Sequence, residues 1–212
     1  MGQLKDDELK LKYSICVSGA AGGKTVDLYK NLAERLGIAI AKRGHILTTG
    51  ATVGLQFFAA KGASEAGGTS IGFSPASSVR EHLRKYRLPR QYFDFVSYTG
   101  LEYVGRDAFL IQSSDAVITI GGRFGSLHEF VTALEAHKPV GVLINSGGTA
   151  DLIPELMKVL EPPKQHLVVY DENPENLVQR MVDILDVEFA DVNKDLKRNT
   201  FWFLENKSDN HH

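Results

Sequence analysis

The sequence is poor in cysteine and in long apolar runs. Cys16 is the single cysteine among 212 residues, so no disulfide can form within the chain and nothing requires an oxidising compartment. No apolar run approaches the roughly 20 residues that a membrane span needs, and the charged residues 1–12 lack the apolar core of a signal peptide. We therefore expect a cytoplasmic protein without a membrane partner, in which Cys16 is an inert core thiol.

The chain also lacks an excess of charge of either sign. Its formal net charge is -2, from 24 Lys and Arg and 26 Asp and Glu, which gives no reason to expect nucleic acid as a partner. His45, His82, His137 and His166 show no spacing typical of metal ligands, so no metal site is expected. A hydrophobic fraction of 43% is ordinary for a globular protein, and the length fits one large domain.

Glycine is abundant, with 20 residues, and it gathers at the ends of short apolar segments. These segments predict strands over residues 13–18, 45–49, 69–73, 115–120, 139–145 and 165–170. Helical spacing predicts helices between them, over 24–43, 53–66, 124–136, 151–160 and 174–185. Strands that alternate with helices predict βαβ units. The expected fold is therefore α/β, a doubly wound Rossmann-like parallel sheet with helices on both faces.

No linker or repeat divides the chain. We expect a polar N-terminal segment over residues 1–12, a single nucleotide-binding domain over 13–186, and a C-terminal tail over 187–212 that is apolar only at 201–204. Residues 74–99 make an unusually long connection with a basic run. A solvated helix face is the favoured interpretation of that run, ahead of a lid over an anionic ligand or an RNA contact. The run comprises Arg80, Arg84, Lys85, Arg87 and Arg90.

Glycine-rich turns that follow predicted strands point to a ligand site. In open α/β sheets, ligands bind outside the carboxyl ends of the strands. Glycine lets backbone N–H groups approach an anion there, and the next helix offers unpaired donors and the positive end of its dipole. The expected phosphate- or nucleotide-binding residues are Gly19, Gly22, Gly23, Gly50, Gly54, Gly121, Gly122, Arg123, Gly125 and Ser126.

One of these turns, residues 18–25 (SGAAGGKT), differs by one residue from a Walker A loop. A P-loop phosphotransferase also needs a later strand that ends in an aspartate to help hold Mg²⁺. The best later strands end in Gly121 and Asn145 instead, so this function is disfavoured. Lys24 and Thr25 are expected to open a helix, with Thr25 as a candidate N-cap.

A longer constellation covers residues 106–130. It contains Arg106, an apolar helix, DAVI at 115–118 and IGGRFGSLHE at 120–129. It resembles the Lonely Guy family of cytokinin-activating phosphoribohydrolases, long mislabelled lysine decarboxylases, and their molybdenum-cofactor-carrier relatives. Their pattern is an arginine, an apolar helix, a DAxI strand and Pro-Gly-Gly-x-Gly-Thr-x-x-Glu. Residues 50–68 also resemble the family's glycine turn, helix and AxxGAxxxGG stretch, and the whole resemblance covers about 13–145.

The resemblance implies that Arg106 and Glu129 form the catalytic pair, and that the glycines at 121, 122 and 125, with Ser126, cradle a 5′-phosphate. A carboxylate suits N-glycosidic cleavage, because it stabilises an oxocarbenium-like species and activates water. A nearby arginine would orient phosphate or ribose and keep that carboxylate ionised. The competing structural explanation for Glu129 is a capping box with Ser126.

Departures from the hydrolase pattern leave two functions open. Ile120 replaces the proline, Ser126 the threonine, and Asp107 follows Arg106 where the hydrolases tend to carry a basic residue. An Ile-Gly-Gly turn is more similar to the carrier branch, for which binding without hydrolysis is implied. The alternatives are a nucleoside 5′-monophosphate phosphoribohydrolase and a non-catalytic nucleotide or molybdenum-cofactor carrier or sensor. No cofactor is required, a nucleotide or a phosphate-bearing pterin is the expected ligand, and the resemblance implies a homodimer or homotetramer.

Overall fold

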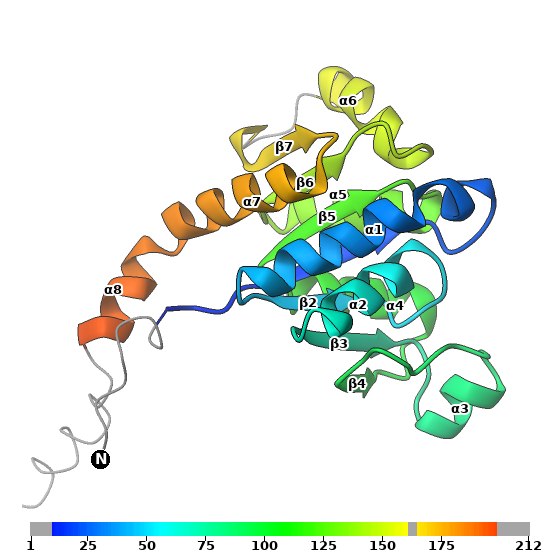
Figure 1. Ribbon diagram of the computed structural model, residues 1–212. Coiled ribbons are helices and arrows are strands. Elements are labelled where there is room, and N and C mark those ends of the chain that lie inside the picture. Colours follow the sequence, from blue (N-terminus) through cyan, green and yellow to red (C-terminus); the bar gives the residue numbers. More distant parts are fainter. Residues whose placement is uncertain (1–9, 161–164, 199–212) are drawn as a thin grey trace, which may run out of the picture.

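The computed structural model describes residues 10–160 and 165–198. Seven parallel strands form one sheet in the order β4-β3-β2-β1-β5-β6-β7 (Figure 1). The strands are β1 (Ser14–Gly19), β2 (Ile46–Thr49), β3 (Thr69–Ser74), β4 (Phe95–Tyr98), β5 (Ala116–Ile120), β6 (Val140–Leu143) and β7 (Val168–Asp171). The expected doubly wound α/β fold is confirmed, because nearly continuous apolar strands are the mark of a parallel sheet buried on both faces.

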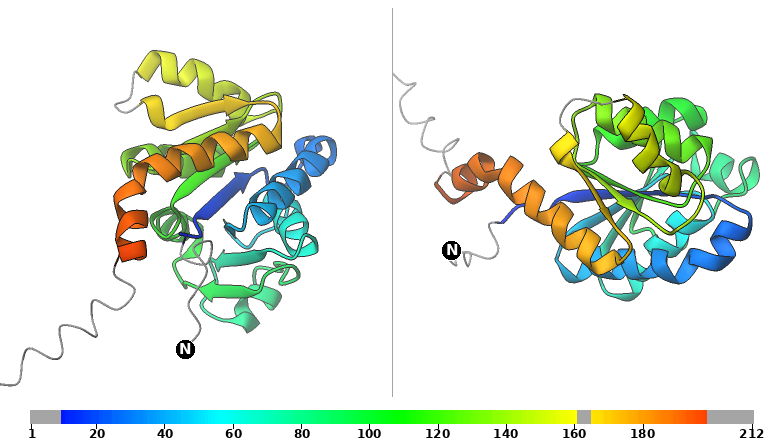
Figure 2. Two further views of the ribbon diagram at one scale, coloured as in Figure 1. Left: turned by 60° about the vertical axis from the view of Figure 1, so that its left-hand side comes forward. Right: turned by 90° about the horizontal axis from the view of Figure 1, so that it is seen from above.

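Helices cover both faces of this sheet (Figure 2). They are α1 (Lys24–Lys42), α2 (Leu55–Glu65), α3 (Val79–Arg84), α4 (Glu102–Gln112), α5 (Phe124–Glu135), α6 (Thr149–Leu160), α7 (Pro174–Glu188) and α8 (Ala190–Arg198). One apolar core packs α1, α2 and α7 against the sheet, with Leu36 and Met181 among its buried residues. A second core packs α4, α5 and α6 on the other face, with Leu110 and Phe130. Cys16 belongs to this second core, and its burial raises the pKa of its thiol.

Two glycines bring α1 and α2 into backbone contact. A Cβ added at Gly37 would lie 1.9 Å from the Ala59 carbonyl oxygen, and one at Gly62 would lie 2.1 Å from the Glu34 carbonyl oxygen. Gly62 belongs to the AxxGAxxxGG stretch of the sequence, which therefore serves helix packing. A larger residue at either position would push the two helices apart.

The structure corrects the predictions at the start of α1 and at the start of β7. Helix α1 begins at Lys24 with Gly23 as its N-cap, so the expectation that Thr25 caps it is wrong. The predicted strand over 165–170 begins with a 3₁₀ turn (Gln165–Leu167), and β7 starts only at Val168. Thr25 lies inside the helix because Gly23, at φ 88°, takes the left-handed turn that precedes it.

Helix α8 follows α7 after Phe189, and side chains of both helices contact the residues just before β1. The Asn193 side chain donates to the Tyr13 hydroxyl at 3.1 Å and accepts from the Leu11 backbone N–H at 3.3 Å. Asp186 binds Lys10 at 2.9 Å and the Tyr13 hydroxyl at 2.8 Å. Residues 1–9 of the predicted N-terminal segment and the apolar residues 201–204 of the tail lie outside the described part of the chain.

The long connection over 74–99 holds α3 and leads into β4. Its fixed point is His82, which is fully buried. Nε2 of His82 donates to the Pro89 carbonyl at 2.9 Å, and Nδ1 forms a hydrogen bond with the Ser74 hydroxyl at 2.8 Å. The five basic residues of this connection are exposed, as a solvated face requires. Within residues 10–160 and 165–198, no helix combines the length and the apolarity of a membrane crossing.

Candidate functional site

A cavity of about 240 Å³ opens at the carboxyl ends of β1 and β5. These strands are neighbours in the sheet, yet the chain leaves β1 for α1 on one face and β5 for α5 on the other. Such a switch point is where open α/β sheets bind ligands. The cavity is lined by Val17, Ser18, Gly19, Ala20, Ala21, Gly50, Thr52, Gln56, Tyr103, Arg106, Asp107, Arg123, Gly125, Ser126 and Glu129.

The structure brings seven of the sequence-predicted site residues to this cavity and leaves five outside its lining. Those in the lining are Gly19, Gly50, Arg106, Arg123, Gly125, Ser126 and Glu129. Those outside it are Gly22, Gly23, Gly54, Gly121 and Gly122. Sequence reasoning missed the side chains of Ser18, Gln56, Tyr103 and Asp107. Tyr103 stands three residues before Arg106, and that helical spacing was a usable signal.

Glu129 is one of two buried carboxyl groups that line the cavity, and it is only 8% exposed. Its Oε2 accepts a hydrogen bond from the Ser18 hydroxyl at the end of β1. Helix α5 begins at Phe124 with Arg123 as its N-cap and without a side-chain cap, so Ser126 and Glu129 do not form a capping box. Burial raises the pKa of Glu129 to about 7, and the Asp107 carboxylate adds to this rise. Arg106 and the Ser18 hydrogen bond lower the pKa, but they do not outweigh burial.

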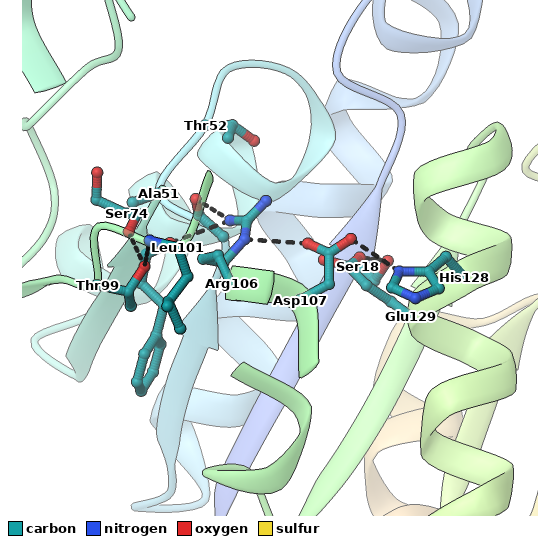
Figure 3. Close-up of polar contacts among 12 residues, drawn as sticks. Ser18, Ala51, Thr52, Ser74, Thr99, Leu101, Arg106, Asp107, His128 and Glu129 are labelled. Atoms are coloured by element: carbon teal, nitrogen blue, oxygen red, sulfur yellow. Dashed lines mark hydrogen bonds and ion pairs between the residues drawn. The ribbon is translucent and has the colours of Figure 1, made fainter. Parts of the chain in front are cut away.

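Arg106 is held in the wall of the cavity by three acceptors (Figure 3). Its Nε donates to Asp107 Oδ1 at 3.0 Å, and its Nη1 donates to the backbone carbonyls of Phe73, at 3.0 Å, and Gly50. A Cβ added at Gly50 would lie 1.8 Å from Nη1, so a larger residue there would displace the Arg106 side chain. Arg106 thus forms its ion pair with Asp107 rather than with Glu129. The expectation that Arg106 keeps Glu129 ionised does not fit the raised pKa of Glu129.

Asp107 connects Arg106 on α4 to His128 on α5 (Figure 3). Its Oδ2 accepts from Nδ1 of His128 at 3.1 Å, while Oδ1 accepts from Arg106. The Asp107 side chain is 8% exposed, whereas that of His128 is 44% exposed. The wall therefore contains the Asp107 and Glu129 carboxyl groups and the Arg106 guanidinium, with the His128 imidazole on the solvent side.

Four helices begin at this edge without a side-chain cap. They are α1, α2, α4 and α5, with N-caps Gly23, Gly54, Leu101 and Arg123. By contrast, α3 and α7 are capped by the side chains of Ser78 and Asn173. Uncapped first-turn N–H groups and the helix dipole favour an anion. The first turn of α5 supplies Gly125 and Ser126 to the lining of the cavity.

The Gly121-Gly122 turn has a structural task. Both residues adopt left-handed conformations, with φ of 55° and 103°. The Gly121 N–H donates to the Ser146 hydroxyl at 2.8 Å, and the Gly121 carbonyl accepts from the Ala150 N–H at 2.9 Å. These bonds tie the turn after β5 to the start of α6. The phosphate role predicted for these two glycines therefore stays a prediction.

Residue types and spacing disfavour two other kinds of site, a metal site and a P-loop, and the structure bears on both. In the described part of the chain, no group of three or more His, Cys, Asp or Glu side chains could hold a metal ion. Lys24, the lysine of the Walker A-like segment, is exposed and lies outside the lining of the cavity.

A parallel sheet with a glycine-bordered cavity at its switch point defines a Rossmann-like ligand-binding protein. The chain matches the model of the SLOG cluster4 family over residues 12–178, and it belongs to that family. The expected resemblance to the Lonely Guy proteins and their carrier relatives is thereby confirmed.

Three relatives show how the chain compares. A cytokinin riboside 5′-monophosphate phosphoribohydrolase of Arabidopsis thaliana is 26% identical over 208 residues, 91% of this chain and 85% of that protein. The molybdenum cofactor binding protein of the phototrophic bacterium Rippkaea orientalis superposes with a TM-score of 0.68 at 30% identity, covering 82% of this chain and 98% of that one. The molybdenum cofactor carrier protein of Chlamydomonas reinhardtii gives a TM-score of 0.67 at 28% identity, with 82% and 99% coverage.

Proposed function

We propose that the cavity binds a nucleoside 5′-monophosphate and that Glu129 acts on its N-glycosidic bond. The observation that carries this proposal is the buried Glu129 carboxyl group, which faces the cavity beside Ser18 and has a pKa raised to about 7. A group that titrates near neutral pH can both give and take a proton during a reaction. Perturbed carboxyl groups in clefts are candidates for catalysis for that reason.

The reaction is a hydrolysis. The bond between C1′ of the ribose and the base nitrogen breaks, and its electron pair leaves with the base, which takes up a proton. Water adds its hydroxyl to C1′ and loses the other proton. The ionised Glu129 carboxylate would stabilise the positive charge that develops on the sugar and accept the proton from water. The products are the free base and ribose 5-phosphate.

The phosphate of this ligand would lie against the first turn of α5. Gly125 and Ser126 contribute uncapped backbone N–H groups there, and Arg123 adds a positive charge at the same end of the cavity. The three features are complementary to a dianion. This placement leaves the Glu129 side of the cavity for the ribose.

A carrier without turnover is the second candidate, and two observations favour it. Arg106 is committed to Asp107 and to two backbone carbonyls, so it is not paired with Glu129. The turn also holds two residues, Arg123 and Phe124, between Gly122 and Gly125, where the hydrolase pattern has one. The ligand would then be a nucleotide or, as for the related proteins of Rippkaea orientalis and Chlamydomonas reinhardtii, a molybdenum cofactor.

The test is a turnover assay with AMP and other nucleoside monophosphates, with the released base separated by chromatography. Glu129→Gln removes the titrating group, and Glu135→Gln is the matched control because Glu135 lies exposed on the same helix. Base release that disappears only in Glu129→Gln supports the hydrolase. No release, together with saturable binding of a nucleotide or pterin phosphate, supports the carrier. Absence of both release and binding contradicts both candidates.

A further inference from the structure

Asp107 uses both of its carboxylate oxygens inside the wall of the cavity. Oδ1 accepts from Arg106 Nε at 3.0 Å, and Oδ2 accepts from His128 Nδ1 at 3.1 Å. A carboxylate that is 8% exposed is costly to bury unless it is bonded on both sides, and here each bond comes from a strong donor. Because a carboxylate can only accept, His128 donates through Nδ1 and turns its Nε2 away from Asp107.

The first consequence concerns the orientation of Arg106. A guanidinium is planar, so a bond to Nε and two bonds to Nη1 fix its plane. Asp107 supplies the first, and the carbonyls of Phe73 and Gly50 supply the others. Within residues 10–160 and 165–198, Nη2 has no hydrogen-bond partner, so it is the nitrogen left for a ligand.

The second consequence concerns charge. Arg106 is the cation that would otherwise stabilise an ionised Glu129, but its ion pair with Asp107 offsets part of that effect. Asp107 also places a negative charge beside Glu129, and two neighbouring carboxyl groups resist ionising together. The other titratable or charged groups near this region are Tyr103 on α4, Arg123 and His128 at the start of α5, and the Cys16 thiol on β1.

We propose that Asp107 is a positioning residue of this site, which aims Arg106 Nη2 at the ligand and makes Glu129 the group that exchanges the proton. Asp107 would orient Arg106 and affect the ionisation of Glu129 whether or not the site hydrolyses a nucleotide. Only the use of the Glu129 proton in catalysis rests on the proposed function. It also assigns a task to the departure at position 107, where the hydrolases tend to carry a basic residue. A cavity with this arrangement binds an anionic phosphate best while Glu129 is protonated.

The test is a titration of the Glu129 carboxyl carbon by ¹³C NMR, assigned with Glu129→Gln, which requires no turnover. Asp107→Asn keeps an acceptor for Arg106 Nε and removes the charge. We expect the midpoint of Glu129, near pH 7 in the natural chain, to fall by at least about one unit, a tenfold change in its ionisation constant. Asp115→Asn is the matched control, because Asp115 lies at the opposite edge of the sheet, where it accepts from Ser14. The midpoint of Glu129 should stay the same in Asp115→Asn.

A second variant acts in the other direction and keeps the test decisive if Asp107→Asn does not fold. His128→Ala removes a half-exposed partner of Asp107, leaves more uncompensated negative charge beside Glu129, and should raise the midpoint. An unchanged midpoint in either folded variant overturns the proposal. Shifts in these directions in a protein that releases no base uphold the positioning role of Asp107 while the hydrolase proposal fails.

Discussion

The Ser18 hydroxyl donates a hydrogen bond to the Glu129 carboxyl group across 111 positions of the sequence. Ser18 lies at the end of β1 and Glu129 lies one turn into α5, the helix that follows the neighbouring strand β5. The bond therefore crosses the switch point of the sheet. It places a polar partner on a carboxyl group that burial would otherwise leave unpaired.

Stability should depend on pH through Glu129. Its pKa rises from 4.5 to about 7 on folding, so the native state holds a proton that the unfolded state loses between these values. The contribution of Glu129 to the free energy of unfolding is then greatest below about pH 4.5 and is lost as pH rises through 7, by up to about 3 kcal/mol. Urea denaturation of the natural chain and of Glu129→Gln at pH 5, 6, 7 and 8 measures the effect. An equal slope in both proteins would contradict it.

Removal of the Ser18 hydroxyl should make Glu129 harder to ionise. The hydrogen bond from Ser18 lowers the pKa of Glu129, so Ser18→Ala should raise the titration midpoint above that of the natural chain. A ¹³C NMR titration of the Glu129 carboxyl carbon measures this midpoint directly. Ser18→Thr keeps a hydroxyl at the same position and serves as the control. A midpoint that stays in place in Ser18→Ala would mean that this bond does not influence ionisation in solution.

Gly50 and Gly22 offer a matched pair of substitutions in the glycine-rich turns. Gly50→Ala would place a Cβ 1.8 Å from Arg106 Nη1, whereas nothing lies within 4 Å of a Cβ at Gly22. We expect Gly50→Ala to displace Arg106, to cost about 1–3 kcal/mol of stability, and to weaken binding of nucleoside monophosphates. Gly22→Ala should change neither. Thermal unfolding and calorimetric binding measure both, and equal behaviour of the two variants would exclude a special role for Gly50.

The sequence was informative where a residue's role depends on its own strand or turn. Alternation of apolar strands and helices predicts a sheet buried on both faces. Because parallel strands all end at the same edge, the sequence also predicts that Arg106 and Glu129 lie near that edge. What the sequence could not predict is which partners the site residues choose. Asp107 meets His128 because α4 and α5 pack side by side on one face. That contact depends on how each helix is rotated, and no local pattern encodes it.

The same limit applies to the glycines. Five of the predicted binding residues lie outside the lining of the cavity, and Gly121 shows the reason. Its N–H, which a sequence pattern assigns to a phosphate, is taken by Ser146, 25 positions later. A glycine-rich turn thus predicts an unusual backbone more reliably than it predicts a ligand contact.

Ser146 is therefore expected to stabilise the turn that follows β5. Its hydroxyl accepts from the Gly121 N–H at 2.8 Å and donates to the Leu143 carbonyl, and the residue is fully buried. Ser146→Ala removes both of these hydrogen bonds and should cost about 1–3 kcal/mol. Thr119→Val is the control, because the buried Thr119 hydroxyl has no hydrogen-bond partner in the described part of the chain. Its loss should be neutral or slightly stabilising. Equal losses in urea denaturation would show that the Ser146 bonds add nothing beyond a buried hydroxyl.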